Sequence, residues 1–317
     1  MYELSESQAA EVSRRGFVYI PGYLGETDLE LLRQGFQEAL EKDPNNDYFR
    51  IMPGTVLSKF QPMFQAISSS IRCAGIKVDG VYGGGLYFAN YAARPDSNPK
   101  AKARGVALDW HQDHDSYYMW QDHHNYINVY IPIEKPDPDR SNLTVVPFDN
   151  LSRQAPELCE KMLARGATRA RKSFGRWVIL DDEWGGKLGK LGCDPAEIEE
   201  TPSLRAGDLL LMRGDILHRT QDTLTRRVAV SFRMMDGHAT VSRKNLARGG
   251  LPKAVMMYVS RGAYKAFIRY FARNHKNEVP IAELAFYMGN IGPTPPSSCG
   301  RLKFVALLMW EKLRAIF

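Results

Sequence analysis

Two side chains of the kind that bind metal ions stand close together in the segment LDWHQDH, residues 108–114. His111 and Asp113 are two residues apart at the end of an expected strand, where alternate side chains project to the same face. An imidazole and a carboxylate from one short stretch, joined by a distant second imidazole, form the facial triad that holds iron(II) and leaves positions open for substrates. The segment therefore predicts a metal centre if a second imidazole can reach it.

The second imidazole is expected in the segment AGDLLLMRGDILHRTQDTLTRRVAVSFR, residues 206–233. A Gly-Asp turn and a strand precede His218, and a further strand is expected to start at Arg226. An arginine that reaches the interior from this strand can bind the far carboxylate of a dicarboxylic acid by paired hydrogen bonds. Arg227, which points to the opposite face of the strand, is the alternative.

The metal pair also has two less specific interpretations. A lone H-x-D is common in polar loops. The segment HQDH is similar to the second half of the H-x-H-x-D-H zinc motif of metallo-β-lactamase-like hydrolases, but that motif needs a histidine where this chain has Asp109. The neighbouring His114, His123 and His124 are expected to face solvent or substrate, not to bind the metal.

Aromatic residues follow the metal motif and would either wall a substrate pocket or pack in the protein core. They are Tyr117, Tyr118, Trp120 and Tyr126. On the strand expected before the motif, Tyr87 and Asn90 would reach a co-substrate if that strand lines the pocket.

The elements that must position these residues are short strands. Seven β-rich runs bounded by turn residues lie between about residues 80 and 235, which favours an antiparallel sandwich or barrel. The interval 151–173 is helix-like or loop-like and is interpreted as an insertion. Apolar residues spaced by three and four predict helices before and after the strands. We therefore expect one domain at 1–240, with a helical cap at about 1–80 and a barrel or sandwich at about 80–240, and a helical extension at 241–317 packed on it.

Composition excludes several classes of protein. With 44% hydrophobic residues in 317, the chain can form a large core, and a net charge of +6 without nucleic-acid-binding motifs argues against a nucleic-acid partner. The cysteines Cys73, Cys159, Cys193 and Cys299 form no C-x-x-C pair, which fits a reducing compartment.

No signal peptide or membrane-spanning run is present, so a cytoplasmic protein is expected. The amphipathic segment at 301–317 is expected to pack on its own domain, without stable membrane insertion.

The order of these motifs resembles the phytanoyl-CoA dioxygenase family of iron(II) and 2-oxoglutarate oxygenases. The resemblance runs from about residue 80 to 235 and is carried by WHxD at 110–113, NxxxP at 128–132, LTVVP at 143–147, and the G-D, H-R-T and R-R-V-A-V segments. It implies a double-stranded β-helix, a jelly-roll or cupin-like barrel that is mainly β, with helical N-terminal and C-terminal extensions.

The resemblance also implies roles for individual residues. Iron(II) would be bound by His111, Asp113 and His218, with 2-oxoglutarate and dioxygen as co-substrates. The residues implied for co-substrate binding are Arg226, Thr220, Asn128 and Tyr87. The family often continues after LTVVP with Gly-Ser-His, whereas this chain continues with Phe-Asp-Asn, and this departure concerns substrate contacts.

The implied reaction is hydroxylation of an unactivated carbon in a small molecule, and desaturation or cyclisation would use the same oxidant. Because the ligand at position 113 is a carboxylate, the coordination site that a related halogenase frees for chloride is filled. The aromatic residues and basic C-terminal helices favour an apolar or weakly anionic substrate. The alternative from a different class is a catalytically silent jelly-roll binding module.

Overall fold

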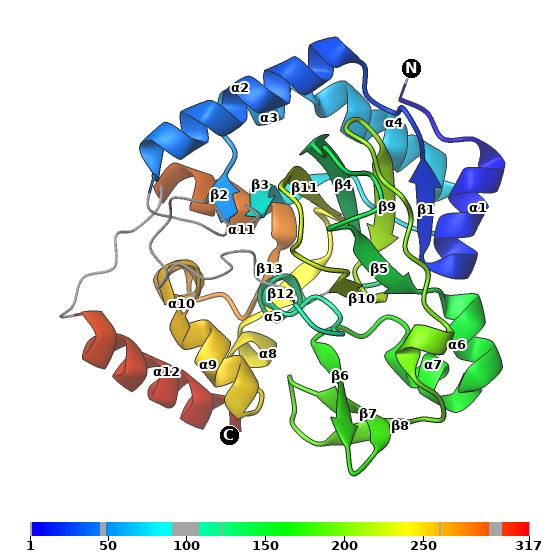
Figure 1. Ribbon diagram of the computed structural model, residues 1–317. Helices are drawn as coiled ribbons and strands as arrows, with labels where there is room; N and C mark the ends of the chain where they lie inside the picture. The colour runs from blue at the N-terminus through cyan, green and yellow to red at the C-terminus, as the bar shows by residue number, and fades with distance from the viewer. Residues whose placement is uncertain are drawn as a thin grey trace, which may run out of the picture.

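The N-terminal part of the chain forms a helix, a strand and a longer helix, as its sequence pattern predicts. The computed structural model describes residues 2–44, 49–90, 108–121, 123–259, 261–291 and 300–316 (Figure 1). Helix α1 (Glu6–Arg15) begins at a capping box, because the Ser5 side chain accepts from the Gln8 amide and the Gln8 side chain accepts from the Ser5 amide. Strand β1 (Phe17–Ile20) and helix α2 (Glu26–Lys42) follow.

A six-stranded antiparallel sheet forms the centre of the molecule, and we call it the major sheet. Its strand order is β1-β9-β4-β11-β3-β2. The other strands are β2 (Phe49–Ile51), β3 (Gly80–Asn90), β4 (Tyr126–Glu134), β9 (Leu209–Arg213) and β11 (Arg227–Met235). Apart from β2 and β3, strands that neighbour one another in this sheet are not consecutive in the sequence, as in a jelly roll.

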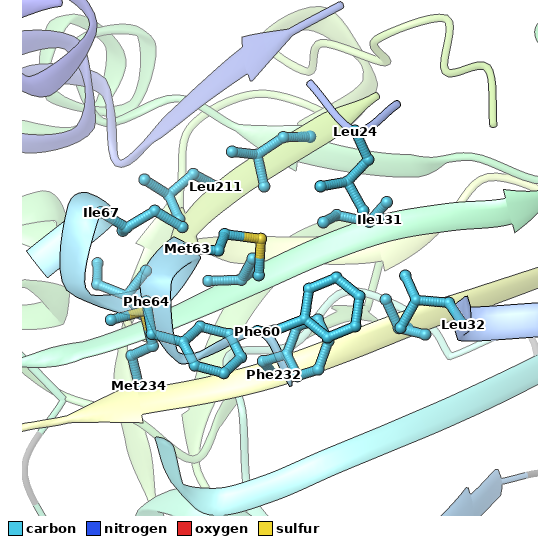
Figure 2. Packing of buried hydrophobic residues seen from close by; sticks show 14 of the residues in the cluster. Leu24, Leu32, Phe60, Met63, Phe64, Ile67, Ile131, Leu211, Phe232 and Met234 are labelled. Carbon is cyan, nitrogen blue, oxygen red and sulfur yellow. The ribbon is translucent and has the colours of Figure 1, made fainter. Parts of the chain in front are cut away.

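Helices α1, α2, α3 (Gly54–Lys59) and α4 (Gln61–Arg72) cover one face of the major sheet (Figure 1). On β11 this face carries every second residue, and Figure 2 shows Phe232 packed against Phe60 and Phe64, with ring centroids 5.9 and 5.0 Å apart. Residues that alternate with Phe232 along β11 therefore point to the opposite face, toward the interior of the jelly roll.

A second layer of strands packs on that interior face, and we call it the minor sheet. Strand β10 (Leu217–Thr220) pairs with β5 (Leu143–Val146), and the segment 110–113 lies between β10 and β6 (Thr168–Ser173). Strands β7 (Arg176–Asp181) and β8 (Lys187–Leu191) extend the sheet beyond β6. The metal motif thus belongs to the middle of an extended minor sheet.

The prediction for the insertion at 151–173 needs a correction at its C-terminal end. Helices α6 (Phe148–Gln154) and α7 (Pro156–Met162) are present, but 168–173 is strand β6. The sequence TRARKS carries too few apolar residues to signal a strand, yet Thr168 and Ala170 are buried while Arg169 and Arg171 are exposed. Its period of two was hidden by the charged residues.

The two sheets enclose an apolar core that includes Phe17, Tyr130, Val145, Leu210 and Met212. The chain is therefore mainly sheet with flanking helices, and among the described residues the strands form antiparallel sheets that do not join into one closed barrel. Cys73, Cys159 and Cys193 are free thiols, and Cys299 lies outside the described residues.

The C-terminal region is helical and packs beside the metal motif. Its elements are β12 (Thr240–Ser242), α8 (Arg243–Ala247), α9 (Leu251–Val259), α10 (Arg261–Asn274), β13 (Glu278–Pro280), α11 (Ile281–Ile291) and α12 (Gly300–Ile316). Helix α5 (Asp115–Trp120), which follows the motif, places Tyr118 and Trp120 in the apolar cluster of these helices. Within the described ranges, no helix combines the length and apolar character needed to cross a bilayer.

Candidate metal centre

His111 and His218 are brought together by the backbone of the minor sheet. The His111 amide donates to the His218 carbonyl over 2.9 Å, and the His218 amide donates back to the His111 carbonyl over 2.9 Å. Such a pair has its side chains on the same face of the sheet. The two imidazole centroids are 4.4 Å apart. Strand pairing therefore turns two residues that are distant in sequence into one pair of ligands.

Both imidazoles are oriented by backbone carbonyls. His111 Nδ1 lies 2.6 Å from the Asp109 carbonyl oxygen, and His218 Nδ1 lies 3.1 Å from the Ile216 carbonyl oxygen. A carbonyl can only accept, so we assign the proton to Nδ1 in each ring. The Nε2 lone pair of each histidine is then available to a metal ion, an arrangement common among ligating histidines.

Asp113 completes the group. Its Oδ2 accepts a 2.6 Å hydrogen bond from Asn128 Nδ2, and its Oδ1 lies 3.9 Å from His218 Nε2. One ligand atom each from His111, Asp113 and His218 lies within 4.8 Å of the other two. Two imidazoles and one carboxylate are the donor set of an iron(II) facial triad, so the predicted ligands meet and their chemistry fits that metal.

The protonation states also suit a metal. Burial, with His218 nearby, lowers the pKa of His111 to about 3. Burial alone would raise the pKa of Asp113, but His218, Arg233 and the Asn128 hydrogen bond outweigh it and lower that pKa to about 2. His111 is therefore neutral and Asp113 is ionised at neutral pH, which are the forms that bind metal ions.

Gln112 is a residue of the site that sequence reasoning missed. It lies between the two ligands and so points the opposite way, into the protein, where it is fully buried. Its Nε2 donates to the carbonyls of Met162 and Asp215, and its Oε1 accepts from the Thr168 hydroxyl over 2.8 Å. A buried amide with three partners fixes the segment that carries His111 and Asp113. The sequence does carry one signal for this role. Gln112 is a polar residue between two ligand candidates, and in a strand its side chain should face away from them, into the protein.

The two arginines at the start of β11 face opposite ways. Arg226 has a side chain that is 49% exposed, and its Nε donates to Glu134 over 2.7 Å. Arg227 is buried, its Nη1 donates to the Ser141 carbonyl over 2.8 Å, and its guanidinium carbon lies 6.0 Å from the Tyr130 ring centroid. The prediction that Arg226 faces the interior is thus corrected to Arg227, because Val228 and Val230 face the helical layer and side chains alternate along β11.

The remaining candidates for co-substrate binding fall into two groups. Thr220 is buried two residues after His218 on β10, so it shares the inward face with that ligand. Tyr87 lies on the opposite face of β3, buried against Phe36 of α2 with ring centroids 5.5 Å apart. Tyr87 is therefore not placed to reach a co-substrate, because the register of β3 turns it toward the helical layer. Asn90 is on the inward face, paired in register with Arg227.

The extra histidines are not grouped with the three ligands. His114 Nε2 lies 3.0 Å from Asp182 Oδ2, and the ring centroids of His114 and His111 are 6.0 Å apart. His123 is buried and stacked on Tyr126, with centroids 5.0 Å apart, so it faces neither solvent nor the ligands. Tyr126, like the aromatic residues of α5, packs against the C-terminal helices.

Comparisons with known proteins agree with this fold. A family model described as phytanoyl-CoA dioxygenase (PhyH) matches residues 12–229. The carbocyclase SnoK from nogalamycin biosynthesis, described as non-haem and α-ketoglutarate-dependent, superposes with a TM-score of 0.51 at 18% identity over 81% of this chain and 90% of its own. This likeness confirms the predicted jelly-roll fold.

Other solved structures are more distant. EctD from S. alaskensis with bound Fe has a TM-score of 0.47 at 12% identity, over 73% of this chain and 76% of its own. HygX from Streptomyces hygroscopicus, with nickel and 2-oxoglutarate bound, has a TM-score of 0.46 at 15% identity, over 74% and 87%. A comparison with curated proteins finds no match.

Proposed function

Because the chain belongs to the phytanoyl-CoA dioxygenase (PhyH) family, we propose that it is an iron(II) oxygenase that uses 2-oxoglutarate and dioxygen to oxidise a small molecule. The observation that carries this proposal is the group formed by His111, Asp113 and His218, whose ligand atoms converge within 4.8 Å. Bound iron(II) would supply the redox chemistry that activates dioxygen. Three protein ligands leave the remaining positions for co-substrates.

Arg227 is the residue that we propose for the far carboxylate of 2-oxoglutarate. Its guanidinium is buried, and its Nε has no hydrogen-bond partner among the described residues although Nη1 is bonded to Ser141. A buried donor without a partner costs about 1–3 kcal/mol, which a bound carboxylate would recover. Thr220, on the inward face of β10, is the hydroxyl that we propose beside it.

We propose that Asn128 also positions a metal ligand, beside the co-substrate role that the resemblance implies. Its Nδ2 donates to Asp113 Oδ2, whereas Asp113 Oδ1 lies 3.9 Å from His218 Nε2. With Oδ2 held in this way, Oδ1 would be the Asp113 oxygen available to a metal ion. Positioning of this kind strengthens a metal site without direct contact.

Hydroxylation is the reaction that we propose, with desaturation or ring formation as variants that need the same site. The Asp113 carboxylate would be the third protein ligand of a bound metal ion, which favours oxygen transfer over halogenation. The chain's own contribution is to orient both substrates and to exclude water from the interior between the two sheets.

Formation of succinate from 2-oxoglutarate tests the proposal. The purified protein, supplied with iron(II) under air, should release succinate, and His111→Ala should abolish this release. Under anaerobic conditions, 2-oxoglutarate should produce a weak visible absorption band with the wild-type iron protein only. A protein that binds neither iron nor 2-oxoglutarate would instead be a silent binding module.

A further inference from the structure

A third arginine, Arg233, lies on the inward face of β11 at the end away from Arg227. Its Cα pairs with that of Asn128 on β4, and directly paired residues project their side chains to the same face with Cβ atoms ~5 Å apart. Asn128 in turn holds Asp113. The side chain of Arg233 therefore lies beside Asn128, the residue that hydrogen-bonds the metal-ligand candidate Asp113.

The chain around Arg233 makes room for its side chain on this face. A Cβ atom at Gly83 would stand 2.8 Å from the Arg233 Cβ and 3.2 Å from its Cδ, so a larger residue there would collide with the arginine. The guanidinium carbon lies 5.8 Å from the ring centroid of Phe88, which also points inward. Arg233 is half-buried, so its charge is at the wall of the interior.

Arg227 and Arg233 stand near opposite ends of the inward face of β11. Along β11, six residues separate Arg227 from Arg233, or ~20 Å of strand at about 3.3 Å per residue. In the proposed function, the metal would hold one end of 2-oxoglutarate and Arg227 its far carboxylate, so both ends of that molecule are assigned. Arg233 would therefore serve a different anion.

We propose that Arg233 binds an anionic oxygen group of the primary substrate, a carboxylate or a phosphate ester, and so holds that substrate beside the metal. This proposal rests on the proposed function, because it assumes that 2-oxoglutarate occupies the Arg227 end. Guanidinium groups match both anions by paired hydrogen bonds. The proposal narrows the expected substrate class. An apolar or weakly anionic small molecule is replaced by a molecule that carries an anionic group at one end.

Three probes of equal chain length test this assignment, namely octanoate, octyl phosphate and the neutral octanamide. Binding is measured calorimetrically to the anaerobic iron(II) protein with saturating 2-oxoglutarate. The wild type should bind one of the two anions at least ~10-fold more tightly than the amide, and the preferred anion identifies the group. Arg233→Gln should remove that preference and leave amide binding unchanged, whereas the exposed control Arg226→Gln should keep it.

The outcomes separate this inference from the function it rests on. Equal or no binding of all three probes by the wild type, or an unchanged preference in Arg233→Gln, would overturn the role of Arg233. Titration of the same samples with 2-oxoglutarate reports on the function itself. A normal absorption band with no anion preference removes only the present inference, and absence of the band removes both.

Helix α12 carries a stripe of apolar residues on its exposed side. Leu302, Val305, Met309 and Leu313 are 84%, 41%, 58% and 50% exposed, and their spacing places them in one stripe along the helix. The opposite side is packed on the protein through buried Phe304 and Leu308. The helix thus has apolar residues on both sides, and among the described residues only one side packs on the rest of the protein.

Basic residues accompany this stripe. Lys303 and Arg314 are exposed, and the Arg314 guanidinium carbon lies 4.8 Å from the ring centroid of Trp310, which is 54% exposed. Glu311, the one acidic residue of α12, is buried and bonded to Arg243. An apolar stripe with an aromatic residue and cationic flanks is typical of helices that lie in an anionic lipid surface. A second copy of this chain would bring like charges together.

We propose that α12 docks the protein on anionic membranes, without crossing them. Wild-type protein should co-sediment with vesicles of phosphatidylcholine and phosphatidylserine but not with phosphatidylcholine alone. Met309→Gln combined with Leu313→Gln, both on the exposed side, should lose this binding. The control Leu224→Gln, which changes an exposed leucine between β10 and β11, should keep it. No binding to the mixed vesicles, or binding that the double variant retains, overturns the proposal. A wild-type dimer that dissociates in the double variant, but not in the control, would show that the stripe binds a second copy of this chain. That result would also overturn the membrane proposal.

Discussion

Arg226 and Arg227 are neighbours in sequence, yet one is paired with Glu134 at the surface and the other is buried against the Ser141 carbonyl. The alternation of side chains along β11 decides which of the two enters the interior, because Val228 faces the helical layer and Arg227 precedes it by one residue. Substitution of either arginine removes one positive charge, from the surface at Arg226 or from the interior at Arg227. The two variants therefore form a matched pair.

Arg227→Met should weaken 2-oxoglutarate binding, because it removes the buried charge that we assign to the far carboxylate. Loss of one partner of a buried charged pair costs about 2–5 kcal/mol, which corresponds to roughly 30-fold or more in affinity. Anaerobic titration of the iron(II) protein with 2-oxoglutarate measures this. Arg226→Met is the control and should change the affinity little. Equal effects from both variants would contradict the assignment.

Asn128→Ala should weaken metal binding without removing a ligand. The variant leaves Asp113 Oδ2 without its 2.6 Å hydrogen bond, so the carboxylate is free to rotate away from the two imidazoles. Loss of a hydrogen bond that orients a ligand typically lowers metal affinity by about 10–100-fold. Competition with a chelator of known affinity gives the value. Affinity equal to that of the wild type would show that the sheet alone orients Asp113.

How far the sequence predicts this site depends on which forces place each residue. The residue types and strand period at His111 and Asp113 are local, so their common face could be predicted. Tyr87 and Asn90 lie on one strand, but the register that turns Tyr87 to the helices is set by packing against α2, which no local pattern encodes. Strand β6 was missed because tertiary pairing with 110–113 overrides its charged composition.

Gln112→Met should destabilise the protein and loosen the metal site together. Methionine fills a similar volume but leaves two carbonyls and the Thr168 hydroxyl without the partner that Gln112 supplies. Each buried group left unsatisfied costs about 1–3 kcal/mol of the free energy of unfolding. Urea unfolding of the metal-free protein measures the loss. Thr168→Val removes one of the three bonds and should cost clearly less; a larger loss in Thr168→Val would contradict this account.

Lys253→Met should be among the most destabilising single changes in the C-terminal region. Lys253 is fully buried, and its Nζ donates to Glu183 over 2.9 Å and to the Asn245 carbonyl over 2.8 Å. Removal of the lysine leaves the buried Glu183 carboxylate without its cation, at a cost of about 3–5 kcal/mol in the free energy of unfolding.

The double variant Lys253→Met with Glu183→Gln separates a charge effect from a packing effect. If the unpaired carboxylate causes the loss, neutralising Glu183 should restore part of the stability lost in Lys253→Met, and denaturant unfolding of all four proteins gives the coupling energy. Additive losses would instead assign the effect to packing of the lysine stem. Because Glu183 directly follows Asp182, which contacts His114, the single variant should also weaken metal binding, and the double variant should recover it.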